Sequence, residues 1–182
     1  MTTLTRIANK HKTDKGTVAY EAHGYTEEYY KYIPETGDYT LIEIGVWHGD
    51  SMRMWEDYNP DLNLFGLEID PNVTRYLKPD DGFNLFVGDA ADPAFIQKVL
   101  VFIHKLDFVI DDGSHKFEDI LASFKLLYPS LKEGGYYFIE DLHAPQARKD
   151  ELFVELLKIC NENASLPWKF RCNDKLLIIQ KP

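Results

Sequence analysis

Two short apolar runs that end abruptly in acidic residues constrain the fold of this chain more than any other feature. One covers residues 107–111 and is followed by Asp112, and the other covers residues 136–139 and is followed by Glu140 and Asp141. Aromatic and β-branched runs of this length are typical of central strands in a parallel sheet. Ligands bind at the carboxyl ends of such strands. We therefore expect the three acids to meet at one edge of a sheet.

Three neighbouring carboxylates repel one another unless a proton or a cation lies between them. Carboxylate oxygens are hard ligands that suit Mg²⁺, Mn²⁺ or Ca²⁺. The sequence therefore predicts a metal site formed by Asp112, Glu140 and Asp141, with Asp112 also part of the catalytic group. His115 follows Asp112 closely and is placed to act beside the ion. The competing interpretations are a helix cap for Asp112, solvated loop acids for the other two, and a helix-start position for His115.

Strand-like and helix-like segments alternate along the rest of the chain. The expected strands cover residues 39–45, 63–69, 83–87, 107–111, 136–139, 167–172 and 175–179. This pattern predicts an α/β fold, a doubly wound, Rossmann-like and mostly parallel seven-stranded sheet that ends in a C-terminal antiparallel hairpin with an Asn173-Asp174 turn.

The expected helices cover residues 51–58 with Ser51 as a plausible cap, 93–103 after an Asp92 cap, about 115–127, and 148–162. We expect residues 1–182 to form a single domain. Within it, residues 1–38 form an N-terminal, tyrosine-rich prelude with one helix near 26–33.

Composition excludes several classes of protein. A formal net charge of −10 argues against a nucleic-acid partner, because such proteins usually present a basic face. No apolar run has the length of a signal peptide core or of a membrane span. Cys160 and Cys172 lack metal-ligand spacing, and Cys160 lies on an apolar helical stripe. We expect no membrane partner and a reducing, cytoplasmic setting.

Three successive strand ends carry features of a nucleoside site. The first expected strand leads into a turn that contains Gly45, and glycine allows a ligand to approach the backbone. Glu68 ends the second strand, at the distance in sequence where an acid typically holds a ribose diol. Asp89 follows the third strand. The glycine turn is a weak signal by itself, but the three strand ends together favour a nucleoside ligand.

At this point the chain resembles the class I S-adenosylmethionine-dependent methyltransferases. Residues 43–45, Glu68 and residues 88–89 stand where that superfamily keeps its glycine loop, ribose acid and adenine-side acid. Residues 111–115 (DDGSH) and 140–143 (EDLH) are similar to the metal-dependent sugar O-methyltransferases of macrolide biosynthesis. Further similar motifs are found at residues 13–16 (TDKG), 23–26 (HGYT) and 51–55 (SMRMW), so the resemblance runs from Asn9 to His143.

The resemblance implies S-adenosylmethionine as cofactor and Mg²⁺ at Asp112, Glu140 and Asp141. It also implies that His115 is the general base. The residues that we expect at the cofactor are Lys15, Tyr25, Glu43, Gly45, Ser51, Glu68 and Asp89, and His143 is expected to contact the substrate. Other interpretations stay open: Lys15 as a solvated side chain, Tyr25 as packing, Glu43 as a hydrogen-bonding partner of its own loop, and His143 as an ordinary loop residue.

The expected reaction is methyl transfer to a sugar hydroxyl of a glycan, glycoside or nucleotide sugar. A divalent cation lowers the pKa of a bound hydroxyl, and an imidazole can then remove the proton. The chain is too short for the extra N-terminal domain of the macrolide enzymes, so their substrate is not carried over. The same acid pattern occurs in a family associated with cephalosporin hydroxylation. A nicotinamide-dependent enzyme and a non-catalytic adenosylmethionine-binding module also stay open as functions, and the sequence leaves the acceptor, the metal and the oligomeric state open.

Overall fold

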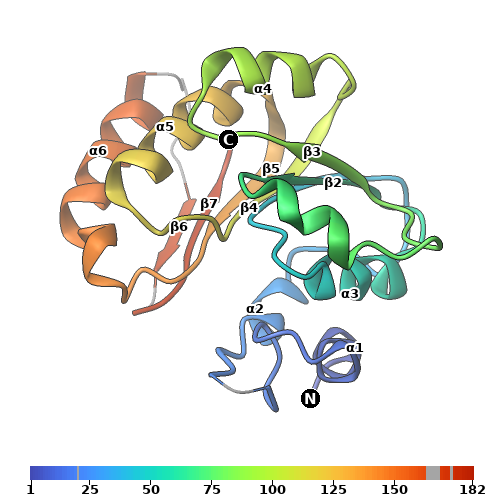
Figure 1. The fold of residues 1–182 in the computed structure, drawn as a ribbon. Coiled ribbons are helices and arrows are strands. Elements are labelled where there is room, and N and C mark those ends of the chain that lie inside the picture. Colours follow the sequence, from blue (N-terminus) through green and yellow to red (C-terminus); the bar gives the residue numbers. More distant parts are fainter. Residues whose placement is uncertain (20, 163–168, 173) are drawn as a thin grey trace.

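One sheet organises the computed structural model, which describes residues 1–19, 21–162, 169–172 and 174–182. Within these residues, seven strands lie in the order β3-β2-β1-β4-β5-β7-β6 (Figure 1). Their bounds are β1 Thr40–Ile44, β2 Asn63–Glu68, β3 Asn84–Val87, β4 Leu106–Asp111, β5 Leu131–Ile139, β6 Lys169–Cys172 and β7 Leu177–Gln180. Strands β1 to β5 pair in parallel, and β7 runs antiparallel to both β5 and β6. The expected Rossmann-like, mostly parallel sheet with a C-terminal antiparallel pair is confirmed.

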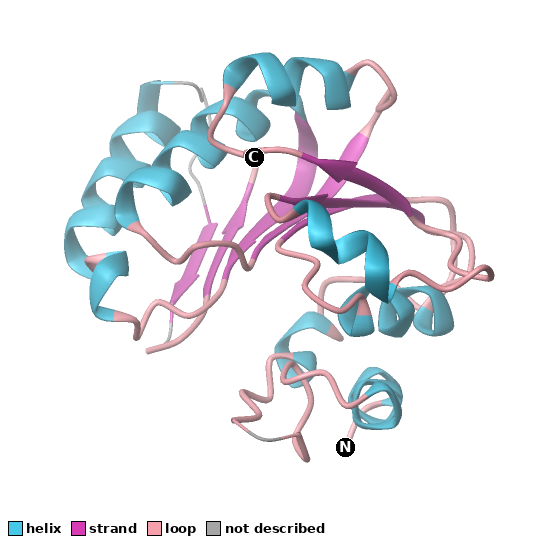
Figure 2. Cartoon of the chain, in the orientation of Figure 1, coloured by secondary structure: helices cyan, strands magenta, loops and turns pink. Residues whose placement is uncertain are grey.

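Helices cover both faces of the sheet (Figures 1 and 2). Helices α1, α2 and α3 lie on one side, and α4, α5 and α6 on the other. The bounds are α1 Thr3–His11, α2 Thr26–Tyr29, α3 Asp50–Tyr58, α4 Pro93–Leu100, α5 Phe117–Leu127 and α6 Lys149–Glu162, with short 3₁₀ turns η1 Pro71–Tyr76, η2 Tyr128–Ser130 and η3 Pro145–Ala147. Each side has its own apolar cluster against the sheet, as a doubly wound fold requires.

The centre of the sheet positions the site. Every residue of β4 is buried, which explains why its sequence is apolar apart from Asp107 and the terminal Asp111. From β1 the chain continues to β2 and β3 on one side, and it then crosses back to β4 on the other side of β1. The direction in which strands are added therefore reverses between β1 and β4. In open α/β sheets, a crevice forms outside the carboxyl ends of the strands at such a point.

The starts of two helices test the expected caps. Helix α3 begins at Asp50, and its N-cap is Gly49, whose φ of 79° is left-handed. The expectation that Ser51 caps this helix is therefore wrong, because the sharp turn needs the glycine that lies two residues earlier. Helix α4 begins at Pro93, and the Asp92 side chain accepts a hydrogen bond from the Ala94 amide, so that cap is confirmed.

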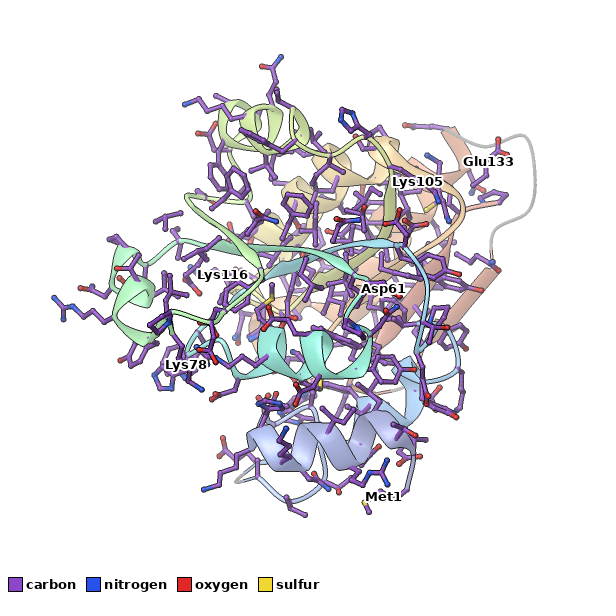
Figure 3. All side chains as sticks on the ribbon, turned by 90° about the vertical axis from the view of Figure 1, so that its right-hand side faces the viewer. Met1, Asp61, Lys78, Lys105, Lys116 and Glu133 are labelled. Carbon is purple, nitrogen blue, oxygen red and sulfur yellow. The ribbon has the colours of Figure 1, made fainter. Side chains whose placement is uncertain are left out.

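The N-terminal prelude contains more helix than expected. Helix α1 was not predicted, and α2 ends at Tyr29, short of the expected end near residue 33. A proline at residue 34 disfavours helical backbone in the residue before it, which limits α2. Helix α1 lies beside α3 (Figures 1 and 3), and Lys10 binds Asp57 across that contact. The buried residues of α1 are Leu4, Thr5 and Ala8, so few large apolar side chains mark this helix in the sequence.

Other expectations differ only at their edges. Strand β2 ends at Glu68 because the Asp70 side chain caps the turn η1 that follows. Cys160 is fully buried, as expected for a core residue. Part of the expected hairpin, residues 167–168 and the Asn173 half of its turn, lies outside the described residues. None of the helices in the described part of the chain is long and apolar enough to cross a membrane.

Candidate active site

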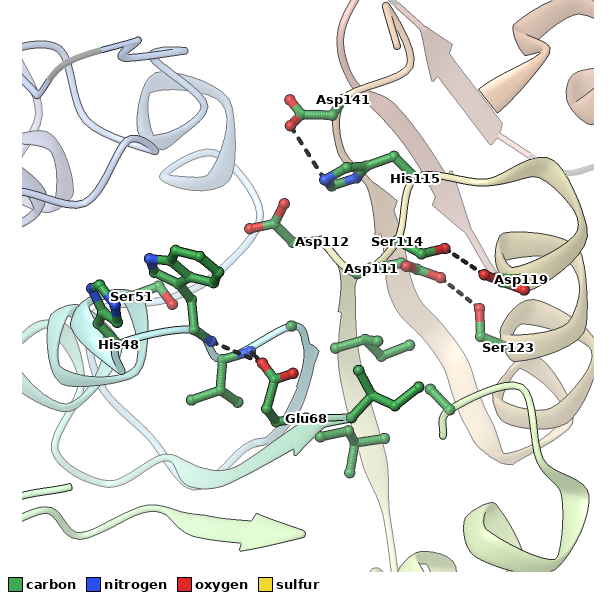
Figure 4. A pocket seen from close by; sticks show the side chains of 18 of the residues that line it. His48, Ser51, Glu68, Asp111, Asp112, Ser114, His115, Asp119, Ser123 and Asp141 are labelled. Carbon is green, nitrogen blue, oxygen red and sulfur yellow. Dashed lines mark hydrogen bonds and ion pairs between the residues drawn. The ribbon is translucent and has the colours of Figure 1, made fainter. Parts of the chain in front are cut away.

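A cavity of about 700 Å³ opens at the carboxyl ends of the central strands (Figure 4). Its size is that of a typical small-molecule site. The predicted site residues that line it are Lys15, Gly45, Ser51, Glu68, Asp89, Asp112, His115 and Asp141. The lining residues do not include Tyr25, Glu43, Glu140 or His143. The structure therefore brings most of the predicted residues to one cavity and places four of them outside its wall.

Glu68 and the glycine loop after β1 form one end of this cavity. The Glu68 carboxylate accepts hydrogen bonds from the backbone amides of Val46 and Trp47, each at 3.0 Å (Figure 4). It thereby ties the end of β2 to the loop. Asp89 follows β3, and its side chain accepts from the Ala91 amide at 2.8 Å. Both carboxylates are thus fixed on the cavity wall and keep further lone pairs for a ligand.

Gly45 is needed for packing as well as for ligand approach. Its φ is +88°, and a Cβ placed there would lie 2.1 Å from the carbonyl oxygen of Asp112. The glycine loop and the end of β4 therefore touch through their backbones. Two residues later, Trp47 has a left-handed φ of 50° and is 75% exposed. A bulky residue in this region is strained, and such strain concentrates at functional sites.

The other end of the cavity holds a group of possible metal ligands. Asp112, His115 and Asp141 each offer a ligand atom, and these atoms lie within 4.8 Å of one another. The His115 Nε2 atom is 3.6 Å from Asp141 Oδ2 (Figure 4). His115 and Asp141 both adopt left-handed backbones, with φ of 56° and 54°. Such backbones cost about 1–3 kcal/mol each, so the rest of the fold must stabilise a conformation that aims these two side chains at one another.

Glu140 faces away from this group. Its carboxylate is 2% exposed and accepts hydrogen bonds from the Tyr29 hydroxyl and from Lys15 Nζ. The Lys15 ammonium also contacts Asp112 directly and lies 3.6 Å from Glu43. Lys15 thus stands between Asp112 and Glu140, where the sequence pattern predicted a metal alone. The three-acid metal site stays a prediction, since Glu140 must turn from Lys15 to join it.

The charges of this buried cluster do not balance. Burial opposes the charge of Lys15, but Asp112, Glu140 and Glu43 outweigh it and raise its pKa well above the usual range. Burial, and then Asp112, raise the pKa of Glu140 well above its ordinary value, against the lowering effect of Lys15. Three acids therefore surround one lysine, and an additional cation or a proton relieves the excess negative charge. The raised pKa of Glu140 favours its protonated form, so a proton supplies part of this relief.

Asp141 lies in a different environment from its neighbour Glu140. Its Oδ1 atom accepts a hydrogen bond from the Tyr25 hydroxyl at 2.6 Å. Burial opposes ionisation of Asp141, but the Tyr25 hydrogen bond and the nearby histidines lower its pKa below the usual value. His143 Nδ1 lies 3.9 Å from Asp141 Oδ1. Tyr25 and His143 therefore approach the site through Asp141 and not through the cavity wall.

Glu43 is fully buried and points towards α3. It accepts a hydrogen bond from the Trp55 indole at 2.8 Å, and burial raises its pKa. The sequence patterns did not identify two residues of this group: Tyr29, which binds Glu140, and His23, which lies 3.6 Å from Asp141. The short HGYT motif at residues 23–26 was the signal for His23, whereas the sequence offered Tyr29 only as an alternative to Tyr25 for covering the cofactor.

Comparison with known proteins identifies a family for this chain. The profile of a family described as a methyltransferase domain matches residues 42–142. The 8-demethyl-8-alpha-L-rhamnosyl tetracenomycin-C 2'-O-methyltransferase of Streptomyces olivaceus is 33% identical to the chain over 148 residues, which are 76% of this chain and 37% of that protein. Demethylmacrocin O-methyltransferase of Streptomyces fradiae is 32% identical, and the match covers 66% of this chain and 32% of that protein.

Solved structures show the same fold. The MycE methyltransferase of the mycinamycin biosynthetic pathway, in complex with Mg, SAH and mycinamycin VI, superposes with a TM-score of 0.75 at 25% identity. The match covers 98% of this chain and 54% of that one. The chain thus spans about a third of the length of the curated relatives above and about half of MycE. On its profile match, sheet order and relatives, the chain belongs to the class I methyltransferase domain family.

Proposed function

We propose that this protein is a metal-dependent O-methyltransferase that moves a methyl group from S-adenosylmethionine to a sugar hydroxyl of a glycan, glycoside or nucleotide sugar. One observation carries the proposal. A single cavity has Glu68 and Asp89 at one end, and Asp112, His115 and Asp141 at the other. A nucleoside cofactor and a metal-assisted acceptor then lie side by side. The names of the relatives, which include a rhamnosyl 2'-O-methyltransferase, support a sugar acceptor.

The cofactor roles follow from position on the cavity wall. Glu68 accepts from the ribose hydroxyls, Asp89 lies by the adenine, and Gly45 lets the methionine part approach the backbone. Ser51 is at the wall near the start of α3, where a carboxylate is favoured by the free amides of a helix N-terminus. Lys15 lines the same cavity, but its ammonium already binds Asp112 and Glu140. Its attraction for a cofactor carboxylate is therefore weaker than that of a free lysine.

The residues fit a divalent cation of the Mg²⁺ or Mn²⁺ type. Asp112 and Asp141 supply carboxylate oxygens, and His115 lies beside them. Glu140 is the proposed third acid. A cation held there lowers the pKa of a hydroxyl that it binds.

His115 is the proposed general base. A neutral imidazole accepts the proton of the acceptor hydroxyl, and Asp141, 3.6 Å from Nε2, stabilises the imidazolium that forms. The backbone of the two strand ends holds the base and the acceptor in fixed positions relative to the cofactor, which in-line methyl transfer requires. His143 is 46% exposed beyond Asp141, on the side where the acceptor enters, and we propose that it contacts the sugar.

Removal of metal tests the proposal. We expect no methyl transfer in excess EDTA, and recovery when Mg²⁺ or Mn²⁺ is added back. The measurement is mass spectrometry of nucleotide-linked and glycan-linked sugars incubated with the protein and S-adenosylmethionine. Calorimetry with S-adenosylhomocysteine and with NAD serves as the control for the cofactor, since only the former should bind. Full transfer in the presence of chelator would refute metal dependence, and binding of NAD alone would refute the cofactor.

A further inference from the structure

Asp141 is surrounded by three histidines that divide between its two oxygens. Oδ2 faces His115 of the site described above, with 3.6 Å to Nε2. Oδ1 faces two other histidines, with 3.6 Å to His23 Nε2 and 3.9 Å to His143 Nδ1. The ligand atoms of His23, Asp141 and His143 lie within 4.8 Å of one another. They form a second cluster on the opposite side of the same carboxylate.

These separations are too long for hydrogen bonds, which span about 2.7–3.2 Å between nitrogen and oxygen. They are close to the separation of neighbouring ligands around one ion. A tetrahedral Zn²⁺ site with bonds of about 2.0–2.1 Å places adjacent ligand atoms about 3.4 Å apart. The two histidine–Asp141 separations exceed this value by a few tenths of an ångström. The two histidine ligand atoms lie within 4.8 Å of each other, so rotation of the half-exposed His143 side chain brings all three groups onto a common cation.

The cluster also lines a cavity of its own. His23, Asp141 and His143 share the wall of a space of about 440 Å³ with Glu21, Ala22 and Lys175. The ring of His23 stacks on Tyr25 at 5.1 Å between centroids, and the Tyr25 hydroxyl holds Asp141 Oδ1 at 2.6 Å. Two of the three ligands are thus positioned in advance, and Oδ1 keeps a second lone pair for an ion.

We propose that His23, Asp141 and His143 form a second metal site, selective for a borderline cation such as Zn²⁺. Two imidazoles and one carboxylate favour zinc-like ions, whereas the carboxylate-rich side of Asp141 favours Mg²⁺. This inference goes beyond the proposed function and shares two residues with it, Asp141, which gives one oxygen to each site, and His143. His143 turns Nδ1 to the carboxylate, so its Nε2 stays available for the acceptor.

The ammonium of Lys175 opposes cation binding at this site. Its Nζ lies 3.2 Å from His23 Nδ1. Coordination through His23 Nε2 places a proton on Nδ1, which then faces the ammonium. Replacing Lys175 by methionine removes this repulsion, and zinc binding should tighten roughly tenfold.

Zinc titration of the untagged, metal-stripped full-length chain tests the site, with calorimetry for stoichiometry and affinity. We expect two equivalents of Zn²⁺ in the wild type and one in each of His143→Ala and His23→Gln. The matched control His115→Ala removes the histidine that faces the other oxygen of Asp141 and should retain the zinc that depends on His143. Circular dichroism and thermal unfolding check that each variant is folded.

Two results would overturn the proposal. One is an unchanged number of zinc ions, bound with unchanged affinity, in both His143→Ala and His23→Gln. The other is loss of the same single zinc ion in His115→Ala and retention in His143→Ala. These results are distinct from failure of the proposed function. If methyl transfer proves independent of metal, loss of one zinc ion in both His143→Ala and His23→Gln, but not in His115→Ala, still supports the second site.

Discussion

At the scale of single residues, the end of β5 serves two different environments. Glu140 turns inward to Lys15 and Tyr29, while Asp141 turns outward to Tyr25 and His115. The pair follows the end of β5, and Asp141 adopts a left-handed φ of 54°, so one acid balances buried charge and the other reaches the cavity. Glu140 and Asp141 form one motif in the sequence, but Glu140 contacts the buried interior and Asp141 contacts the site.

Replacement of His115 tests the base. His115→Ala should lower turnover roughly 10²- to 10⁴-fold if proton removal limits the reaction. Binding of S-adenosylhomocysteine should persist, because His115 lies at the metal end of the cavity. Turnover and cofactor affinity are measured on one preparation, with the exposed His104→Ala as the control. Turnover within about threefold of the wild type in a folded variant would remove His115 from the role of base.

Replacement of Glu68 tests the cofactor end. Glu68→Ala should weaken binding of S-adenosylhomocysteine by about 2 kcal/mol, roughly 30-fold in Kd, because charge-assisted hydrogen bonds to the ribose are lost. The variant also loses the bonds from Glu68 to the Val46 and Trp47 amides, so thermal unfolding is recorded beside calorimetry. Glu118→Ala, whose side chain is 71% exposed in the wild type, is the control. An unchanged Kd would exclude Glu68 from the cofactor site.

At the scale of elements, the N-terminal segment inserts a charge between strand ends. Lys15 lies in the turn after α1, and it binds Asp112 after β4 and Glu140 after β5. Removing one partner from a buried ion cluster leaves uncompensated charge behind. The segment is therefore part of the structure of the site and not an appendage to it.

Lys15→Met should reduce the free energy of unfolding by about 3–5 kcal/mol, because three acids then lack their lysine. Urea denaturation in chelator measures the change. Lys10→Met is the matched control: Lys10 pairs with Asp57 at the surface with 69% exposure, and its loss should cost at most about 1 kcal/mol. Equal effects of the two substitutions would show that the buried cluster does not depend on Lys15.

Sequence periodicity predicted the strands better than the site. The strands around Phe108 and Phe138 stand out because fully buried runs stop abruptly at acids. Helix α1 has too narrow a buried stripe to be recognised. The position of Lys15 depends on partners 97 and 125 residues away in the chain, and no local pattern encodes such contacts. The motifs thus identified which acids gather at the edge, but the direction of each side chain is set by tertiary packing.

At the scale of the whole molecule, stability should depend on pH through Asp111. This residue is fully buried, and burial raises its pKa to about 6, against the lowering effect of a hydrogen bond from Ser123. A carboxyl whose pKa is raised on folding binds its proton more tightly in the folded state. Its contribution to the free energy of unfolding is therefore full below about pH 4 and is lost as pH rises to about 6, by about 3 kcal/mol.

Asp111→Asn should remove this dependence. Relative to the wild type, the variant should gain stability between pH 4 and pH 7, while the exposed Asp61→Asn should show no such trend. Denaturant unfolding of all three proteins across this range, without metal, gives the comparison. A difference between Asp111→Asn and the wild type that stays constant with pH would contradict a raised pKa at Asp111.

The hydrogen bonds from Lys15, Tyr25 and Tyr29 to the two acids after β5 also affect the order in which the site is assembled during synthesis. Lys15 precedes Glu140 by 125 residues, Tyr25 precedes Asp141 by 116, and Tyr29 precedes Glu140 by 111. A ribosome adding about 5–20 residues per second releases the first partner of each pair several seconds before the second. During synthesis the N-terminal segment therefore lacks these hydrogen-bonding partners. The end of the cavity that contains Asp112, His115 and Asp141 is completed only when the fifth strand and the acids after it have emerged.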